Sequence, residues 1–143
     1  MKKKIKKLPV ILTFFLLAGF YCKGSQTANT EQASPMEISF DNFLSTYKSD
    51  KNIKVLDVRE SGEYAAGHVP GAKLAPLSQL KSPSADPENL IPYAKGDNIY
   101  VICRSGKRSM AATQIMRGLG YTNAVSVQGG TLAYINSGNE VEK

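Results

Sequence analysis

The 143-residue sequence predicts an α/β fold built on a parallel β-sheet. The first observation is alternation: from residue 37 onward, short runs typical of strands are followed by segments with helical spacing. The second is composition, since 42% of the residues are apolar and 21% are charged, which indicates a folded domain rather than a disordered or collagen-like chain. The third is that two strand-like runs end in charged or reactive residues, as expected where parallel strands present a ligand site at their carboxyl ends.

The first half of the predicted domain begins with a short strand over 38–40. Asp41 is expected to cap the helix that follows, because an aspartate oxygen can accept the free N–H groups of the first turn. Four apolar residues share one face of this helix: Phe40, Phe43, Leu44 and Tyr47. The segments after it are predicted as a strand over 52–58, a helix over 60–66, a strand over 72–74, a helical turn over 77–80 and a loop over 81–88.

The second half contains the most apolar strand, residues 98–103, whose β-branched run is typical of a strand buried in a parallel sheet. A helix is predicted over 109–119, ending at Gly120. A strand over 124–127, a turn at Gly129 and Gly130, and a last helix over 131–135 complete the domain, which spans 37–143.

The positive charge of the chain is concentrated at its start. The formal net charge is +6, from 18 basic and 12 acidic residues, and five of the lysines lie within the first seven positions. An apolar run over 8–21 follows, and this layout predicts a secretory signal peptide over 1–21. Its fourteen residues would rise about 21 Å as a helix, less than the roughly 30 Å of a bilayer core, so a cleaved signal is favoured over a membrane anchor. The remaining 13 basic and 12 acidic residues leave +1, which argues against nucleic acid as a partner.

Cys22 directly follows the apolar run and resembles the acylated cysteine of a bacterial lipoprotein, although Tyr21 departs from the small residue usual before it. Cleavage near Gly24 is the alternative. Residues 22–36 are rich in Ser, Thr, Gln and Asn and are expected to form a flexible linker. The sequence therefore predicts an exported protein, periplasmic or tethered to the bacterial envelope through a lipid on Cys22.

The candidate chemistry lies after the buried strand, in residues 103–109. Cys103 leaves the strand, and Arg104, Ser105, Gly106, Lys107, Arg108 and Ser109 lead directly into a helix. N–H groups at a helix start and three nearby cations stabilise an anion, so the pKa of Cys103 is expected to be lowered. The segment predicts an ionised sulfur nucleophile in an anion-binding loop. The count of two cysteines and one histidine excludes a Cys/His zinc cluster, and the chemistry of such a thiolate needs no metal or organic cofactor.

This loop resembles the active-site loop of the rhodanese family of sulfurtransferases, and three further motifs in the same order support the resemblance. They are Asp57-Val58-Arg59-Glu60, then Glu63-Tyr64 with Gly67–Ala72, and Gly129–Tyr134, where Tyr134 replaces the more usual Trp. The resemblance implies a rhodanese-like parallel sheet flanked by helices on both faces. It also places Asp57 and Arg59 beside the loop, in a supporting role.

The resemblance implies that a Cys103 persulfide carries a sulfur atom from a small anionic donor, such as thiosulfate, to a thiol acceptor or cyanide. Residues 104–109 would bind the donor and the persulfide. Two alternatives remain: a sulfur-carrier or binding module tethered to the envelope, and a small phosphatase or arsenate reductase. The six-residue loop 103–108 disfavours the second, because phosphatases of this fold have a loop one residue longer. His68 is expected to be structural, since a thiolate activated by its loop needs no general base.

Overall fold

The computed structural model describes residues 35–143. The predicted signal segment, Cys22 and all of the linker except its last two residues lie outside them. A five-stranded sheet with the order β1-β5-β4-β2-β3 forms the centre of the described part, and every neighbouring pair of strands is parallel. The strands are β1 (Glu37–Ile38), β2 (Lys54–Asp57), β3 (Lys73–Leu74), β4 (Ile99–Ile102) and β5 (Ala124–Val127).

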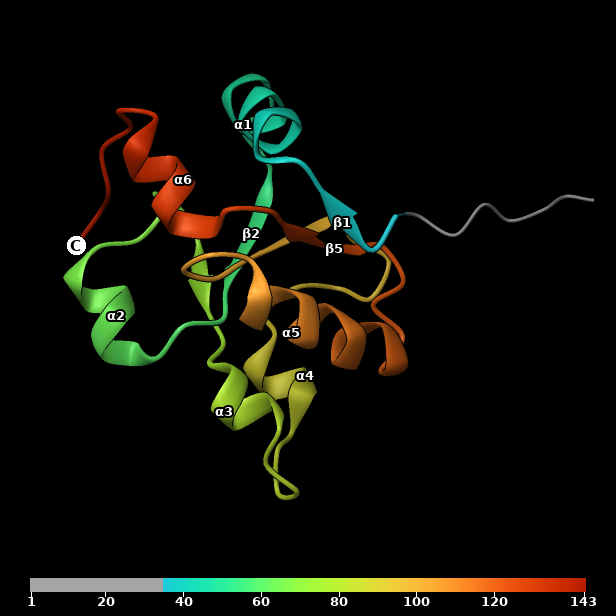
Figure 1. Ribbon diagram of the computed structural model, residues 1–143. Coiled ribbons are helices and arrows are strands. Elements are labelled where there is room, and N and C mark those ends of the chain that lie inside the picture. The colour runs from blue at the N-terminus through green and yellow to red at the C-terminus, as the bar shows by residue number, and fades with distance from the viewer. Residues whose placement is uncertain (1–34) are drawn as a thin grey trace, which may run out of the picture. The chain divides into compact units, whose positions relative to one another are not determined.

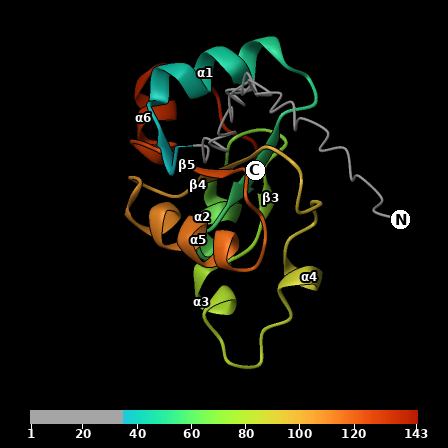
Figure 2. The same ribbon diagram turned by 90° about the vertical axis from the view of Figure 1, so that its right-hand side faces the viewer.

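Helices cover both faces of this sheet, as Figures 1 and 2 show. On one side lie α1 (Phe40–Ser49) and α6 (Gly130–Asn136). On the other lie α3 (Leu77–Leu80), α4 (Pro87–Leu90) and α5 (Lys107–Gly118), while α2 (Ser61–Ala66) follows the carboxyl end of β2. The predicted α/β class with helices on both faces is confirmed.

Alternation along the central strand explains why the sheet needs cover on both faces. Ile99, Val101 and Cys103 belong to a core cluster shared with α3 and α5, whereas Ile102 belongs to a second cluster shared with α1 and α6. A strand that is apolar on both faces stabilises the fold only when both faces are removed from water. Tyr134, the residue found instead of Trp, lies in the second cluster.

Several predicted boundaries differ from the structure. The first helix is capped by Ser39, whose Oγ accepts from the N–H of Asn42 at 3.4 Å, so Asp41 lies inside the first turn rather than at the cap. The first strand is correspondingly shorter than 38–40 and begins at Glu37. The fourth helix begins inside the predicted loop 81–88: Asp86 accepts from the N–H of Glu88, and the next residue is a proline, which is favoured in a first turn.

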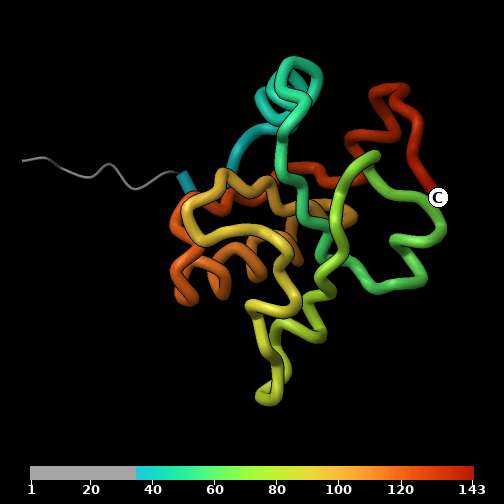
Figure 3. The backbone as a smooth tube through the Cα atoms, turned by 180° about the vertical axis from the view of Figure 1, so that it is seen from behind, coloured from blue at the N-terminus to red at the C-terminus, as the bar shows by residue number. Residues whose placement is uncertain are grey.

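The remaining segment between α3 and α4 extends away from the sheet (Figure 3). The long helix after the cysteine begins at Lys107 rather than at Ser109. Gly106 has a φ of +103°, a value that favours glycine and lets the chain turn directly from β4 into α5. The two cationic residues that follow Gly106 therefore belong to the first turn of the helix.

Candidate active site

Cys103 follows the last residue of β4 and is 1% exposed. The register aligns Asp57 of β2 with Ile102 of β4, so both strands end at the same edge of the sheet. Residues 103–109, called the cysteine loop below, turn at this edge and bring the backbone N–H of Gly106 to 3.1 Å from Cys103 Sγ. The sulfur thus lies where sheet topology places ligand sites, with a helix starting beside it.

Hydrogen bonds determine the electrostatics of this sulfur. Burial raises the pKa of the Cys103 thiol, but hydrogen bonds from the side chain of Ser109 and from backbone N–H groups of Ser109, Ser105 and Gly106 outweigh it. The net effect is a lowered pKa, as the sequence predicts. A thiol with a lowered pKa is more often ionised near neutral pH and therefore more reactive as a nucleophile.

The first turn of α6 holds the backbone of the cysteine loop by two hydrogen bonds. The N–H of Thr131 donates to the carbonyl of Cys103 at 2.7 Å, and the N–H of Leu132 donates to the carbonyl of Arg104 at 3.0 Å. This approach requires glycine at position 130, because a Cβ there would lie 2.1 Å from the carbonyl oxygen of Cys103. The Gly129-Gly130 turn is therefore part of the framework that holds the loop.

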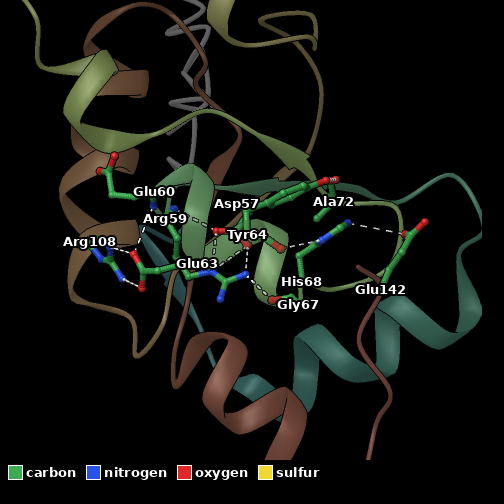
Figure 4. A network of polar contacts seen from close by, with 10 residues as sticks. All are labelled: Asp57, Arg59, Glu60, Glu63, Tyr64, Gly67, His68, Ala72, Arg108 and Glu142. Carbon is green, nitrogen blue, oxygen red and sulfur yellow. Dashed lines mark hydrogen bonds and ion pairs between the residues drawn. The ribbon is translucent and has the colours of Figure 1, made fainter.

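The three cations of the loop have different surroundings. Arg108 forms a two-point ion pair with Glu63 of α2, at 2.6 and 2.7 Å (Figure 4). Arg104 and Lys107 are exposed, and neither forms an ion pair within residues 35–143. The sequence shows no sign that Arg108 differs from the other two; the tertiary structure makes the distinction.

Asp57 and Arg59 form a buried ion pair next to this edge of the sheet. Arg59 Nη2 lies 2.7 Å from Asp57 Oδ2, and the same nitrogen donates to the carbonyl of Gly67 at 2.8 Å (Figure 4). The side chain of Arg59 is 7% exposed and that of Asp57 is 0% exposed, so each charge depends on the other for compensation. This geometry joins the end of β2 to the turn after α2.

His68 also belongs to this network, on the side away from the loop. Its ring stacks on Tyr64 with centroids 3.6 Å apart, and its Nε2 lies 3.7 Å from a carboxylate oxygen of Glu142 (Figure 4). Backbone hydrogen bonds join His68 and Glu142 in both directions. Among the described residues, no hydrogen bond joins His68 to Cys103, and its partners fit the structural role expected from the sequence.

Two surface hollows flank the cysteine loop. One, of about 270 Å³, is lined by Arg104, Leu132 and Ile135 together with residues of α2. The other, of about 470 Å³, is lined by Ser105, Lys107 and Gln128 among others. Each hollow is therefore lined by one of the two exposed loop cations.

No metal site is found in the described part of the chain, where no three His, Cys, Asp or Glu residues form a group that could hold an ion. Residues 35–143 also contain no helix that is long and apolar enough to cross a bilayer.

Comparison with known proteins places this geometry in a family. The Rhodanese-like domain family matches residues 39–137, which is more than half of the chain and includes the whole cysteine loop. The chain belongs to the rhodanese-like domain family. A Bacillus subtilis relative, "Putative sulfur carrier protein YrkF", is 32% identical over 112 residues, covering 78% of this chain and 57% of the relative. The chain thus spans little more than half the length of that relative.

Two further matches come from a human enzyme and a bacterial structure. Human thiosulfate:glutathione sulfurtransferase is 37% identical over 86 residues, covering 53% of this chain and 73% of the enzyme. The crystal structure of a rhodanese-like domain protein from Staphylococcus aureus has a TM-score of 0.62 and 29% identity, and the match covers 76% of this chain and all of that one.

This rhodanese-like domain brings most of its sequence-predicted site residues to one edge of the sheet. The cysteine loop and the pair Asp57–Arg59 lie there together. Sequence reasoning missed Ser126 of β5, whose hydroxyl is 2.9 Å from that of Ser109. The available signal was a serine inside the otherwise apolar strand predicted over 124–127. It also missed the contact of Glu63 with Arg108, for which the sequence carries no signal.

Proposed function

We propose that this rhodanese-like domain is a sulfurtransferase that moves a sulfane sulfur from a thiosulfate-type donor, through a persulfide on Cys103, to a thiol acceptor. The observation that carries the proposal is the environment of the Cys103 sulfur. It is buried at the end of β4, accepts the N–H of Gly106 at 3.1 Å and has a lowered pKa because of its hydrogen bonds. The family membership and the human relative's name support the same chemistry.

In the first half-reaction, the Cys103 thiolate attacks the outer sulfur of thiosulfate. A new S–S bond forms, the bond between the two donor sulfurs breaks, and sulfite leaves with the electron pair. In the second, an acceptor thiolate attacks the terminal sulfur of the persulfide, and Cys103 leaves as the thiolate with which the cycle began. Such double displacement gives ping-pong kinetics. No metal or organic cofactor takes part in these steps.

The N–H groups of the cysteine loop are suited to the terminal sulfur of the persulfide, which carries the negative charge after sulfite leaves. Arg104 and Lys107 are the cations available to a donor anion, because Arg108 is already occupied by Glu63. Within residues 35–143 Cys103 is the only cysteine, so this part of the chain holds no second thiol that could accept the sulfur. With Cys22 lipidated, as proposed below, the acceptor thiol comes from another molecule.

The name of the Bacillus relative favours a second candidate, a sulfur carrier. A carrier accepts the sulfur on Cys103 in the same way but delivers it to one partner protein rather than to small thiols. The two functions differ in turnover: an enzyme releases sulfur repeatedly to a small acceptor, whereas a carrier retains its persulfide until the partner is added.

The test uses the full chain incubated with thiosulfate and then analysed by intact mass. We expect a gain of one sulfur atom, located on Cys103 by peptide analysis and absent from Cys103→Ser. Loss of that sulfur on addition of a small thiol or cyanide, with repeated turnover, supports the enzyme. A stable persulfide supports the carrier. Absence of any adduct, together with hydrolysis of a phenyl phosphate, would replace both by a phosphatase.

We further propose that residues 1–21 direct export and that Cys22 becomes lipidated, which would hold the domain at the bacterial envelope. The support is the arrangement of five lysines, an apolar run and a cysteine. Mass analysis of the N-terminal peptide from the membrane fraction tests this. An acylated Cys22 is the expected result, and an unmodified N-terminus on a protein in the soluble fraction would contradict it.

A further inference from the structure

Two buried serine hydroxyls lie in a row beside the Cys103 sulfur. Ser109 belongs to the cysteine loop, and Ser126 comes from β5. Ser109 Oγ is 3.5 Å from Cys103 Sγ, 2.9 Å from the carbonyl oxygen of Gly106 and 2.9 Å from Ser126 Oγ. Both serines are fully buried. Ser126 lies on β5, which packs against α5 (Figure 1), and it shares the α5-facing side of the strand with Ala124.

Ser109 Oγ has three hydrogen-bond partners but only one proton, so it can donate to one of them at a time. A hydroxyl has one proton to donate and can accept two hydrogen bonds. In the thiol state Cys103 donates to Ser109, and Ser109 gives its own proton to the carbonyl of Gly106. The hydroxyl of Ser126 then acts as the donor in its contact with Ser109, because the Ser109 proton is already used.

When Cys103 ionises, its proton goes to bulk water and the sulfur becomes an acceptor. The proton of Ser109 can turn from the Gly106 carbonyl to the sulfur. This rotation leaves no buried carbonyl unsatisfied, because the carbonyl of Gly106 also accepts the N–H of Met110 at 3.1 Å. The contact from Ser126 persists through the rotation and polarises the Ser109 hydroxyl, which makes it a stronger donor to the anion.

We propose that Ser126 is a positioning residue for the reactive sulfur: it donates to Ser109 and so enables Ser109 to turn its single proton onto the Cys103 anion. The inference rests on the proposed use of Cys103 as a thiolate nucleophile. The side chain of Ser109 is foremost among the groups that lower the pKa of Cys103, so a change that weakens its hydrogen bond should reach the sulfur.

The charged groups around the sulfur do not change when Ser126 is replaced. Arg104, Lys107 and Arg108 lie on the loop and the start of α5, and Arg108 interacts electrostatically with Cys103. The elements packed at this edge contribute the pair Asp57–Arg59 after β2 and Glu63 on α2. A change in Cys103 reactivity in a Ser126 variant therefore reports on the hydroxyl and not on a lost charge.

The experiment measures the rate at which iodoacetamide alkylates Cys103 as a function of pH, in the full chain, with peptide mass analysis separating Cys103 from Cys22. For Ser126→Ala we expect the midpoint of the profile to rise by about half to one pH unit, which lowers the rate below the midpoint roughly three- to ten-fold. Ser109→Ala should raise the midpoint at least as much. Because alkylation needs no sulfur donor, this result is independent of whether the sulfur-transfer proposal holds.

Three comparisons make the test specific. Thr113→Val is the matched control, because Thr113 is buried on the same helix as Ser109 and its hydroxyl has no hydrogen-bond partner among residues 35–143. The midpoint of this variant should equal that of the wild type. Ser126→Thr keeps the hydroxyl and should also retain the wild-type midpoint. In the double variant of Ser109 and Ser126, the Ser126 change should add nothing further. An unchanged midpoint in Ser126→Ala, or a full Ser126 effect in the absence of the Ser109 hydroxyl, would overturn the proposal.

Discussion

Glu63 of α2 and Arg108 of α5 are 45 positions apart in the sequence and form a two-point ion pair, with nitrogen–oxygen distances of 2.6 and 2.7 Å. Glu63 also belongs to the capping box of α2, together with Glu60. The pair therefore ties the helix that follows β2 to the helix that begins at the cysteine loop. It also fixes the side chain of one loop cation, whereas Arg104 and Lys107 form no ion pair within residues 35–143.

This ion pair should make stability depend on acid pH. Hydrogen bonding from Arg108 lowers the pKa of Glu63 to about 2, below its ordinary value of 4.5. A carboxyl whose pKa is lower in the folded state stabilises the fold fully above the ordinary value, and this contribution is lost as the pH falls towards about 2. We expect Glu63→Gln to be less stable than the wild type at neutral pH, by under about 1 kcal/mol because the pair is about one-third exposed.

Urea unfolding at several pH values measures this difference, which should shrink to nothing as the pH falls towards about 2. Glu88→Gln is the control, because Glu88 pairs with Lys95 on the surface, where its side chain is 75% exposed. Its stability should match the wild type throughout. A Glu63→Gln deficit of the same size at every pH would show that lost packing, not the charge, is responsible.

Removing an exposed loop cation should weaken donor binding more than chemistry. For Arg104→Ala or Lys107→Ala we expect the KM for thiosulfate to rise by about three- to ten-fold while kcat changes less, since these charges attract the anion from solvent. The rise should shrink at high ionic strength. Lys81→Ala, at the exposed end of α3, makes the same charge change away from the site. Equal KM values for Arg104→Ala and Lys81→Ala would contradict the assignment.

Gly130→Ala should damage both the fold and the site. The added Cβ would lie 2.1 Å from the carbonyl oxygen of Cys103, and Gly130 has a φ of +57°. Overpacking together with a left-handed backbone predicts a loss of about 2–4 kcal/mol in the free energy of unfolding. Gly118→Ala is the control, because it lies in α5 with nothing within 4 Å of the added atom. It should be neutral or more stable by up to about 1 kcal/mol. Thermal unfolding of both variants provides the comparison. A Gly130→Ala variant as stable as the wild type would contradict the close packing of Gly130 against the Cys103 carbonyl.

The buried pair Asp57–Arg59 should behave as mutually dependent charges. Arg59→Met leaves the carboxylate of Asp57 buried without a counter-charge and is expected to cost about 3–5 kcal/mol. The double variant Asp57→Asn with Arg59→Met removes both charges and should recover much of that loss. Denaturant unfolding of the two variants is the measurement. A double variant that is less stable than the single one would mean that the hydrogen bonds of Asp57 to the backbone, rather than charge compensation, dominate.

Much of the fold follows from local patterns. The buried strand 98–103 was recognisable because both of its faces are apolar, and the strand over 124–127 matches β5 in full. The errors lie where caps decide the outcome: Ser39 rather than Asp41 caps α1, and Asp86 with the proline after it begins a helix inside the predicted loop. Both errors concern a cap that a short polar side chain provides, and the hydrogen bond to a first-turn N–H identifies that residue only once the backbone is placed.

The candidate site divides in the same way. The nucleophile and its loop could be predicted because Cys103, the glycine that turns the chain and the helix start are contiguous in sequence. Ser126 and Glu63 could not, since each reaches the loop from another element. The sequence alone determined that a cysteine would end a buried strand and meet helix N–H groups. The packing of β5 and α2 around that strand decided which hydroxyls and which cation surround the sulfur, because such contacts depend on register and helix placement rather than on neighbouring residues.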